Sequence, residues 1–235
     1  MTNEAWSQRV KLSIIVPVLN ERDSIADALN ALAALRARGT EVIVVDGGSD
    51  DGTAEIAAEG ADHVMTAQRG RATQQNAGAE RASGDVLLFL HGDTRLPPDA
   101  DVFIEHALAD VTCHWGRFDV CFGADATMLR VIAAMMNARS RWTGVVTGDQ
   151  CLFVRRIAFA AVGGFPAIAL MEDVALSKLL RRQSAPACLR ATATTSARRW
   201  QTRGLWRTII LMWWLRLAYV LGVPTERLAR WYNKG

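Results

Sequence analysis

Three apolar runs rich in β-branched residues are each followed by polar residues that could bind a ligand. These are residues 12–17, followed by Asn20 and Glu21; residues 41–46, which end in Asp46; and residues 86–90, followed by His91 and Asp93. Each cluster alone is typical of an ordinary turn without a ligand, because Asn, Asp and Gly are common turn residues. Ligands bind at the carboxyl ends of parallel strands, so three clusters at one edge of a sheet indicate a binding site.

His91 and Asp93 are spaced to share one cation. At a strand end, residues i and i+2 project to the same side, about 6–7 Å apart. A carboxylate oxygen suits Mg²⁺ or Mn²⁺, and an imidazole favours Mn²⁺ among such ions. The alternative is that Asp93 belongs to a turn and caps a helix near residues 97–101. The pair therefore predicts a divalent metal, Mn²⁺ or Mg²⁺.

Missing motifs exclude several common enzyme classes. None of the three lysines follows a glycine, so the chain has no GxxxxGK[ST] phosphate loop, and it lacks GxGxxG, HExxH and GxSxG. The four cysteines form no CxxC pair, which excludes a zinc ribbon and favours a reduced, cytoplasmic compartment. No nucleic-acid-binding motif is present, so no nucleic acid partner is expected.

The elements that must position these residues alternate between strands and helices. Strands are expected over 12–17, 41–46, 62–66, 86–90, 115–122 and 151–155, and helices over 24–38, 53–58, 71–83, 128–141 and 172–182. This alternation predicts parallel βαβ units and an α/β fold. With 50% hydrophobic residues among 235, the chain can bury a substantial core. We expect one domain over 1–197 and a helical extension over 198–235.

The C-terminal extension is basic and rich in tryptophan. Residues 198–235 carry a charge of +7, which leaves −4 on residues 1–197. The apolar segment 206–223 contains Arg207 and Arg216, and an arginine near its centre opposes a membrane-spanning role. Two expectations remain: a helix packed on the core or on another subunit, or a peripheral contact with an anionic membrane surface at the inner face of the cell membrane.

The ordered motifs resemble family 2 glycosyltransferases of GT-A fold. The matching stretches are SIIVPVLNE (13–21), VVDGGSDDGT (44–53), GRATQQNAGAERASGDVLLFLHGDT (70–94), GGF (163–165) and MEDVALSKLL (171–180). Over roughly residues 12–225, the chain more closely resembles a bacterial subgroup, the radical-SAM/selenodomain-associated or arsenosugar-biosynthesis-type glycosyltransferases, through GRFDV, TGDQCLFVRR and RRW. The resemblance implies a GT-A fold with a mostly parallel central sheet.

The resemblance also implies a donor site at the strand ends. Its implied members are Pro17, Asn20 and Glu21 in the nucleoside pocket, Asp46 at the base, Arg71 near the base or a phosphate, and Arg198, Arg199 and Trp200 over the diphosphate. The family's usual DxD motif is HxD here. Asp93 is therefore expected to ligate the metal, with His91 as a further ligand or as a contact to ribose or sugar.

For catalysis, the resemblance implies Asp173 as the general base, with Glu172 beside it. Acids in the first turn of a helix are also stabilised by its dipole, by about 0.3–1 kcal/mol, and this purely structural explanation remains open for Glu172. Asp149 and Gln150 are implied as acceptor contacts, although Asp149 could equally be a turn residue.

We therefore expect an inverting, metal-assisted glycosyltransferase that moves a sugar from a nucleotide-diphosphate donor to the hydroxyl of a small-molecule or lipid-linked acceptor. A sugar-1-phosphate nucleotidyltransferase is the alternative enzyme, but residues 17–24 lack the glycine-rich, basic signature it needs. A non-catalytic nucleotide-sugar-binding assembly partner is the other alternative.

Overall fold

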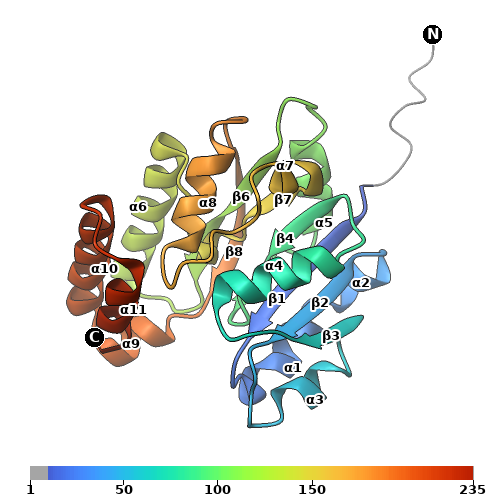
Figure 1. Cartoon of the computed structure of the whole chain (residues 1–235), viewed down its shortest axis with the longest axis horizontal. Coiled ribbons are helices and arrows are strands. Elements are labelled where there is room, and N and C mark those ends of the chain that lie inside the picture. The colour runs from blue at the N-terminus through green and yellow to red at the C-terminus, as the bar shows by residue number, and fades with distance from the viewer. Residues whose placement is uncertain (1–9, 235) are drawn as a thin grey trace.

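A computed structural model of the chain describes residues 10–234, except for the side chains of residues 199, 201, 203, 233 and 234. One eight-stranded sheet, in the order β3-β2-β1-β4-β7-β6-β8-β5, runs through the molecule (Figure 1). The strands are β1 (Leu12–Val18), β2 (Glu41–Asp46), β3 (His63–Thr66), β4 (Val86–Phe89), β5 (Thr94–Arg95), β6 (Trp115–Phe122), β7 (Phe153–Arg155) and β8 (Ala187–Thr195). The helices are α1 (Arg22–Asn30), α2 (Ala33–Ala37), α3 (Thr53–Ala57), α4 (Arg71–Arg81), α5 (Ala100–Ala107), α6 (Thr127–Thr143), the 3₁₀ turn η2 (Gly148–Gln150), α7 (Arg156–Ala161), α8 (Glu172–Leu180), α9 (Arg198–Arg203), α10 (Leu205–Val220) and α11 (Thr225–Lys234).

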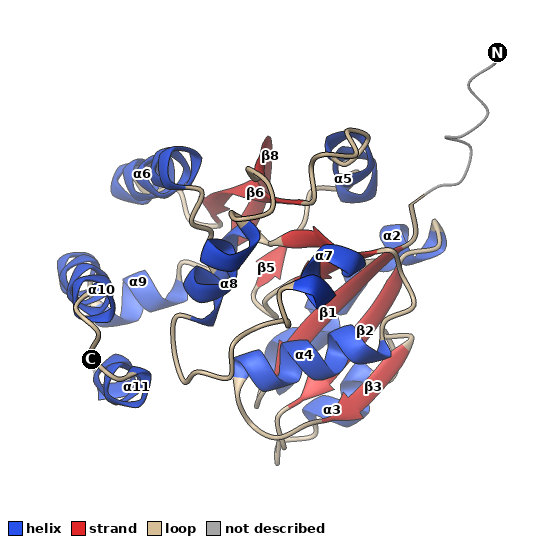
Figure 2. Cartoon of the chain, turned by 45° about the horizontal axis from the view of Figure 1, so that its top comes forward, coloured by secondary structure: helices blue, strands red, loops and turns tan. Residues whose placement is uncertain are grey.

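The first half of the sheet is parallel and is covered on both faces. β1 pairs in parallel with β2 and β4, and β2 pairs in parallel with β3. Successive residues of β1 face opposite layers: Ile14 belongs to the buried cluster that includes Ile25 of α1, whereas Ile15 belongs to the one that includes Ala72 of α4. Figure 2 shows α4 lying across one face of these strands. At Gly78, α4 approaches β1 so closely that a Cβ atom would lie 2.5 Å from a methyl carbon of Ile15. The predicted α/β architecture is confirmed.

The second half of the sheet mixes strand directions. β7 is antiparallel to both β4 and β6, β6 and β8 are parallel, and the short edge strand β5 is antiparallel to β8. The sequence analysis missed β5, β8 and α7. The sequence of β8, ACLRATATT, contains mainly small and hydroxyl-bearing residues, and most of its side chains are only half-buried. It therefore lacks the apolar run that predicted the other strands.

Two expected boundaries differ from the structure in ways that affect the site. The helix expected over 24–38 divides into α1 and α2. The strand expected over 86–90 ends at Phe89, and a turn follows in which Thr94 N–H donates to the His91 carbonyl over 3.0 Å. Since His91 and Asp93 lie in this turn, the expectation that strand alternation aligns their side chains is wrong, whereas the predicted divalent metal stays a prediction.

The chain ends in three helices, α9, α10 and α11, of which α10 lies beside α6 (Figure 1). Leu205 and Ile209, from the start of α10, pack against Leu129 and Ile132 of α6. Leu215 of α10 lies in a separate small apolar cluster that also includes residues of α11. The predicted helical character of the C-terminal part is confirmed.

No helix within residues 10–234 combines the length and the apolar character needed to cross a membrane.

Candidate functional site

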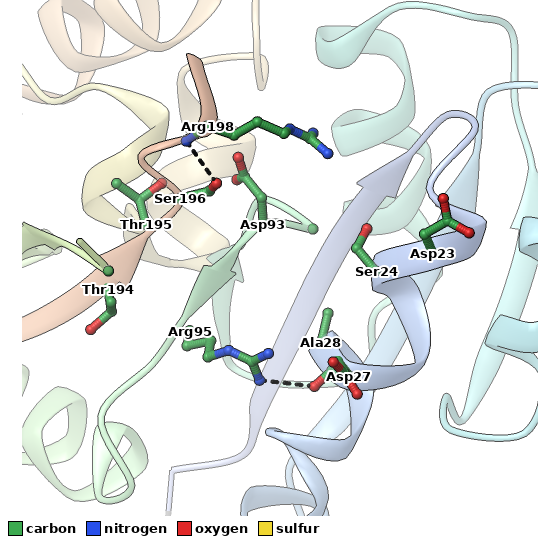
Figure 3. A pocket seen from close by; sticks show the side chains of 12 residues that line it. Asp23, Ser24, Asp27, Ala28, Asp93, Arg95, Thr194, Thr195, Ser196 and Arg198 are labelled. Atoms are coloured by element: carbon green, nitrogen blue, oxygen red, sulfur yellow. Dashed lines mark hydrogen bonds between the residues drawn. The ribbon is translucent and has the colours of Figure 1, made fainter. Parts of the chain in front are cut away.

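A cavity of about 290 Å³ lies between α1 and the end of β8. Asp93 and Arg198 both line it, although they are far apart in the sequence. Figure 3 shows these two residues on one side of the cavity and Asp23 and Ser24 of α1 on the other. Ser196 connects the first two, because its N–H donates to the Asp93 carbonyl over 3.2 Å and its hydroxyl accepts from Arg198 N–H over 3.1 Å. The fold thus brings an acidic and a basic residue of the predicted donor site, Asp93 and Arg198, to the same cavity.

Asp93 fits a role as a single metal ligand. Its side chain is exposed, and the Thr94 hydroxyl donates to it over a long 3.4 Å. Within the described residues, no group of three or more His, Cys, Asp or Glu side chains is placed to hold an ion. Mg²⁺ and Mn²⁺ often take only one or two protein carboxylates and complete their shell with water and phosphate oxygens. The residues present therefore fit an ion that arrives with a phosphorylated ligand rather than a closed metal cage.

His91 does not line this cavity and packs instead against η2. Its Nδ1 lies 3.5 Å from Oδ1 of Asp149, and a Cβ atom on Gly148 would lie 2.1 Å from its Cε1. Only glycine allows such a close approach of backbone to an imidazole ring. The buried Nε2 of His91 has no hydrogen-bond partner among the described residues. The structure thus separates the surroundings of His91 from those of Asp93.

Asp173 lies on the far side of the same glycine, at the start of α8. Gly148 N–H donates to Asp173 Oδ2 over 2.8 Å, and Val174 N–H donates to Oδ1 over 2.7 Å. These two backbone donors fix the orientation of the carboxylate. Gly148 therefore contacts both the His91 ring and the Asp173 side chain, which brings two predicted site residues together across η2.

Glu172 is buried beside Asp173 and faces Arg71. Its Oε1 lies 3.6 Å from Arg71 Nη1, and its side chain is 5% exposed. Burial raises the pKa of Glu172 above its ordinary value, the charge of Asp173 raises it further, and Arg71 partly opposes both effects. This carboxyl therefore binds a proton at a higher pH than an exposed glutamate does.

The loops after β1 and β2 are joined by hydrogen bonds. Asn20 N–H donates to the Ser49 hydroxyl over 2.9 Å, and Asp50 N–H donates to Asn20 Oδ1 over 3.1 Å. The buried Asp46 carboxylate accepts from Gly48 N–H, Ser49 N–H and the Ser49 hydroxyl. The Asp46 carboxylate therefore stabilises the turn that follows β2, and a hydrogen bond to a nucleotide base would be additional to that role.

Pro17 and Glu21 lie in the same layer of loops. Pro17 is half-buried on β1, opposite Val45 of β2. Glu21 N–H donates to the Thr53 hydroxyl over 2.9 Å, and its carboxylate accepts from the Ser24 hydroxyl over 2.7 Å. Glu21 thus connects the start of α1 to the start of α3.

Within the described chain, only three residues other than glycine have a positive φ. They are Asn20 at 52°, Cys151 at 48° and Met171 at 70°. Asn20 is itself a predicted site residue, Cys151 directly follows η2, and Met171 directly precedes Glu172. A left-handed backbone costs such residues of order 1–3 kcal/mol and tends to persist at functional sites. Cys151 and Met171 therefore mark the segments around η2 and α8, and Asn20 marks the loop after β1.

Three predicted residues differ from the others. Gln150 is fully buried, and its amide donates to Ser140 of α6 over 3.0 Å, so it anchors η2 instead of facing an acceptor. The Trp200 ring packs against Phe122 at a centroid distance of 5.6 Å in the cluster below α10, and it does not line the cavity. The Arg199 side chain lies outside the described residues.

Three residues whose pKa values depend on the charge of Asp173 were not predicted from the sequence: Arg139 of α6, and Arg216 and Tyr219 of α10. Burial lowers the pKa of Arg139 to about 10 and also lowers the pKa of Arg216, and the charge of Asp173 opposes both shifts. Burial raises the pKa of Tyr219, and the charge of Asp173 raises it further. Arg216 carried a signal in the sequence, because it interrupts an otherwise apolar segment. Nothing local in the sequence indicates that its charge interacts with that of Asp173.

The class of protein follows from the fold, which is that of GT-A glycosyltransferases. One similar structure is a mannosyltransferase from Pyrobaculum calidifontis in complex with GDP-Man and Mn²⁺, at a TM-score of 0.63 and 20% identity, over 91% of this chain and 62% of that one. Another is glucosyl-3-phosphoglycerate synthase from Mycobacterium tuberculosis with Mn²⁺, UDP and glucosyl-3-phosphoglycerate, at a TM-score of 0.62 and 18% identity, over 94% of this chain and 83% of that one.

The chain belongs to glycosyl transferase family 2, whose model matches residues 13–161. An undecaprenyl-phosphate 4-deoxy-4-formamido-L-arabinose transferase of Yersinia pestis is 30% identical over 161 residues, which are 62% of this chain and 48% of that protein. The glycosyltransferase AglE of Haloferax volcanii is 38% identical over 91 residues, which are 35% of this chain and 30% of that protein. The matched regions thus span less than half of these curated relatives. The predicted family is confirmed.

Proposed function

We propose that the chain transfers a sugar, with inversion, from a nucleotide-diphosphate donor to an acceptor, assisted by Mn²⁺ or Mg²⁺. One observation carries this proposal: Asp93 and Arg198 line the same cavity. A donor diphosphate bound with its metal needs both a carboxylate for the ion and a cation for the phosphate oxygens. When bound, the metal offsets the charge that develops on the departing diphosphate.

The donor's nucleoside is assigned to the loops after β1 and β2. Pro17, Asn20 and Glu21 form the pocket wall, and Asp46 and Arg71 lie at its edge. The hydrogen bonds between these loops support the assignment, because a pre-ordered pocket loses less entropy when it binds a ligand. The sequence stretches that resemble the radical-SAM/selenodomain-associated subgroup support membership of that subgroup.

Asp173 is assigned as the base that takes the proton of the acceptor hydroxyl. A hydroxyl becomes a good nucleophile only as its proton leaves, and a positioned carboxylate contributes about 10²–10⁴ in rate. The hydrogen bond from Gly148 supports this role by fixing the direction of the carboxylate. Glu172 and Asp149 are assigned as neighbours that orient the base and the acceptor, and His91 packs against η2, which contains Asp149.

The acceptor is assigned as a small molecule or a lipid-linked one, and α10 as a peripheral contact with the inner face of the cell membrane. Large apolar side chains of α10 are exposed, namely Trp206, Ile210, Trp213, Trp214, Leu217 and Val220. Their spacing repeats every three to four residues, which places them along one side of the helix. The basic tail complements anionic lipid, and one relative's name includes undecaprenyl phosphate.

Nucleotide binding by calorimetry tests the donor assignment. UDP and GDP are titrated with Mn²⁺ or with EDTA into the unchanged protein, Asp93→Ala and Asp125→Ala, a control that removes a carboxylate with 92% exposure. We expect one nucleotide to bind only with Mn²⁺, and Asp93→Ala alone to abolish that binding. Binding that is indifferent to both EDTA and Asp93→Ala would refute the metal-linked donor site.

A further inference from the structure

Gly148 lies between the His91 ring and the Asp173 carboxylate. A Cβ atom on Gly148 would lie 2.1 Å from Cε1 and 2.3 Å from Nε2 of His91, so this edge of the ring occupies the place where a side chain would begin. The N–H of the same glycine donates to Asp173 Oδ2 over 2.8 Å. A displacement of Gly148 would therefore move a hydrogen-bond donor of Asp173, and the His91 ring blocks one direction of that displacement.

The His91 ring is held in place by its own surroundings. The His91 carbonyl accepts from Thr94 N–H over 3.0 Å, in the turn that also contains Asp93. The side chain is 14% exposed, and its Nδ1 lies 3.5 Å from Oδ1 of Asp149. The buried Nε2 has no hydrogen-bond partner among the described residues. The edge of the ring that meets Gly148 therefore does so by packing and not by a hydrogen bond.

The turn η2, which contains Gly148, is anchored to α6. Gln150 N–H donates to the Thr147 carbonyl over 2.8 Å, and the Gln150 side-chain amide donates to the Ser140 hydroxyl of α6 over 3.0 Å. The His91 ring and η2 are thus held by separate hydrogen bonds. Neither can move away from the other without disturbing the bonds that hold it.

We propose that His91 is a positioning residue for the base: its ring holds Gly148 in place, and Gly148 N–H aims the Asp173 carboxylate. Because His91 shares its turn with Asp93, the contact links the turn assigned to the donor's metal with the base assigned to the acceptor hydroxyl. A base displaced by about 1 Å can lose about 10²-fold in rate. The role of Asp173 as the base rests on the proposed function, whereas the contact between His91 and Gly148 rests on the structure alone.

Gly148→Ala and His91→Ala, alone and combined, test the contact itself. Single-turnover transfer with saturating donor and thermal unfolding are measured for each, with His106→Ala as the matched control at an exposed histidine of α5. We expect Gly148→Ala to slow transfer by at least about tenfold and to lower the unfolding temperature, and His91→Ala to slow transfer by a smaller factor. The control should change neither quantity.

The combined variant is the sharpest part of this test. Without the His91 ring there is room for the new Cβ, so the combined variant should transfer faster and unfold at a higher temperature than Gly148→Ala alone. Independent losses that add up in both quantities would show that the ring does not restrain Gly148, and would overturn the proposal.

A second pair of variants separates positioning of the base from support of the fold. His91→Ala is combined with Asp173→Asn, and single-turnover transfer is measured as before. If His91 acts through the base, its removal costs little once the base is lost, so the combined variant should transfer within about twofold of Asp173→Asn alone. An equal fall in both backgrounds would overturn the proposal. His91→Ala removes atoms and adds none, so this measurement decides the matter even if Gly148→Ala does not fold.

Nucleotide binding distinguishes positioning of the base from a direct contact with the donor. We expect UDP or GDP with Mn²⁺ to bind His91→Ala as it binds the unchanged protein in calorimetry. A loss of nucleotide affinity would assign His91 to the donor or its metal and overturn the positioning role.

Failure of the proposed function would look different. If Asp173→Asn transfers at the rate of the unchanged protein, Asp173 is not the base, and the positioning role falls with it. A recovered unfolding temperature in the combined variant of His91 and Gly148 would then still establish the contact between them. If Asp173→Asn is slow and the losses from His91→Ala simply add to it, the proposed function stands and the positioning role alone is refuted.

Discussion

Two regions of the molecule differ in how their side chains are bonded. One is formed by the loops after β1 and β2, and the other by α6 and α10. In the first region, the Asp46 carboxylate and the Asn20 amide are bonded to neighbouring turns. In the second, the buried Nε and Nη2 of Arg139 have no hydrogen-bond partner among the described residues, and Trp213 is 66% exposed. The first region is complete without a partner, whereas the second leaves charged and apolar groups for something else to cover.

This difference indicates where the molecule depends on its surroundings. A pre-ordered loop layer can receive a nucleotide with little rearrangement. The helices at the other end are stabilised by small apolar clusters and expose large apolar side chains. Asp173 belongs to neither region: it lies at the start of α8 and accepts a hydrogen bond from Gly148 of η2.

The largest effect is expected for Asp173→Asn. The substitution preserves shape and removes basicity, so transfer should fall by at least about a hundredfold while nucleotide binding stays normal. Single-turnover transfer with saturating donor measures the first quantity, and calorimetry measures the second. Asp125→Asn, at an exposed position, is the control. Turnover close to that of the unchanged protein would remove Asp173 as the base.

A large effect on membrane contact is expected from the exposed side of α10. Replacing Ile210 and Trp213 by serine removes apolar area that no core residue covers, so binding to anionic vesicles should weaken by at least about tenfold. The unfolding temperature should remain the same, because both side chains are exposed. Sedimentation with vesicles and thermal unfolding give the two measurements. Unchanged vesicle binding would contradict the assigned membrane contact.

A moderate effect on stability is expected for Asp46→Ala, in the loops after β1 and β2. The variant leaves two backbone N–H groups and the Ser49 hydroxyl without their acceptor, which should lower the free energy of unfolding by about 1–3 kcal/mol. The donor dissociation constant should also rise, because the turn borders the nucleoside pocket. Chemical denaturation and calorimetry measure these changes, with Asp50→Ala as the exposed control. Equal stability of the two variants would refute this role of Asp46.

The smallest effect is expected for Glu172→Gln and depends on pH. The folded-state pKa of Glu172 is raised, so protonation of this carboxyl stabilises the fold fully below its ordinary value of 4.5. That contribution is lost as the pH rises through the folded-state pKa. At pH 7 the neutral glutamine should therefore raise the unfolding temperature by about 1–3 °C.

The gain from Glu172→Gln should disappear towards pH 4, where the glutamate itself is protonated. Thermal unfolding across this range measures the trend. A variant that is less stable at pH 7 would show that the ion pair with Arg71, at 3.6 Å, outweighs the burial of Glu172.

Local sequence patterns predicted the first half of the fold well. The expected strands 12–17, 41–46 and 86–90 correspond, within one residue, to β1, β2 and β4, because their β-branched, apolar side chains require burial on both faces. The same patterns failed for β8, whose small and hydroxyl-bearing residues are held in the sheet by pairing with β6. Pairing of distant strands is not encoded in the periodicity of either strand alone.

The candidate site was predictable to the same extent. Turn chemistry and the family resemblance singled out Asn20, Asp46, Asp93 and Asp173, whose roles stay predictions. Gln150 was misassigned because its burial depends on α6, which precedes it in the chain and packs over η2. His91 was aligned with Asp93 on the assumption of an extended strand, and the turn after Phe89 separates their surroundings.

The sequence by itself determined the order of strands and helices in the first half, the polar turns at the strand ends and the family, because each is written in contiguous residues. Only the tertiary structure decided that Arg198 and Asp93 line one cavity and that Gly148 N–H donates to the Asp173 carboxylate. These pairs join residues that are far apart along the chain. Their formation depends on how β8, η2 and α8 pack, and the free energy of that packing is distributed over many weak contacts rather than over any local motif.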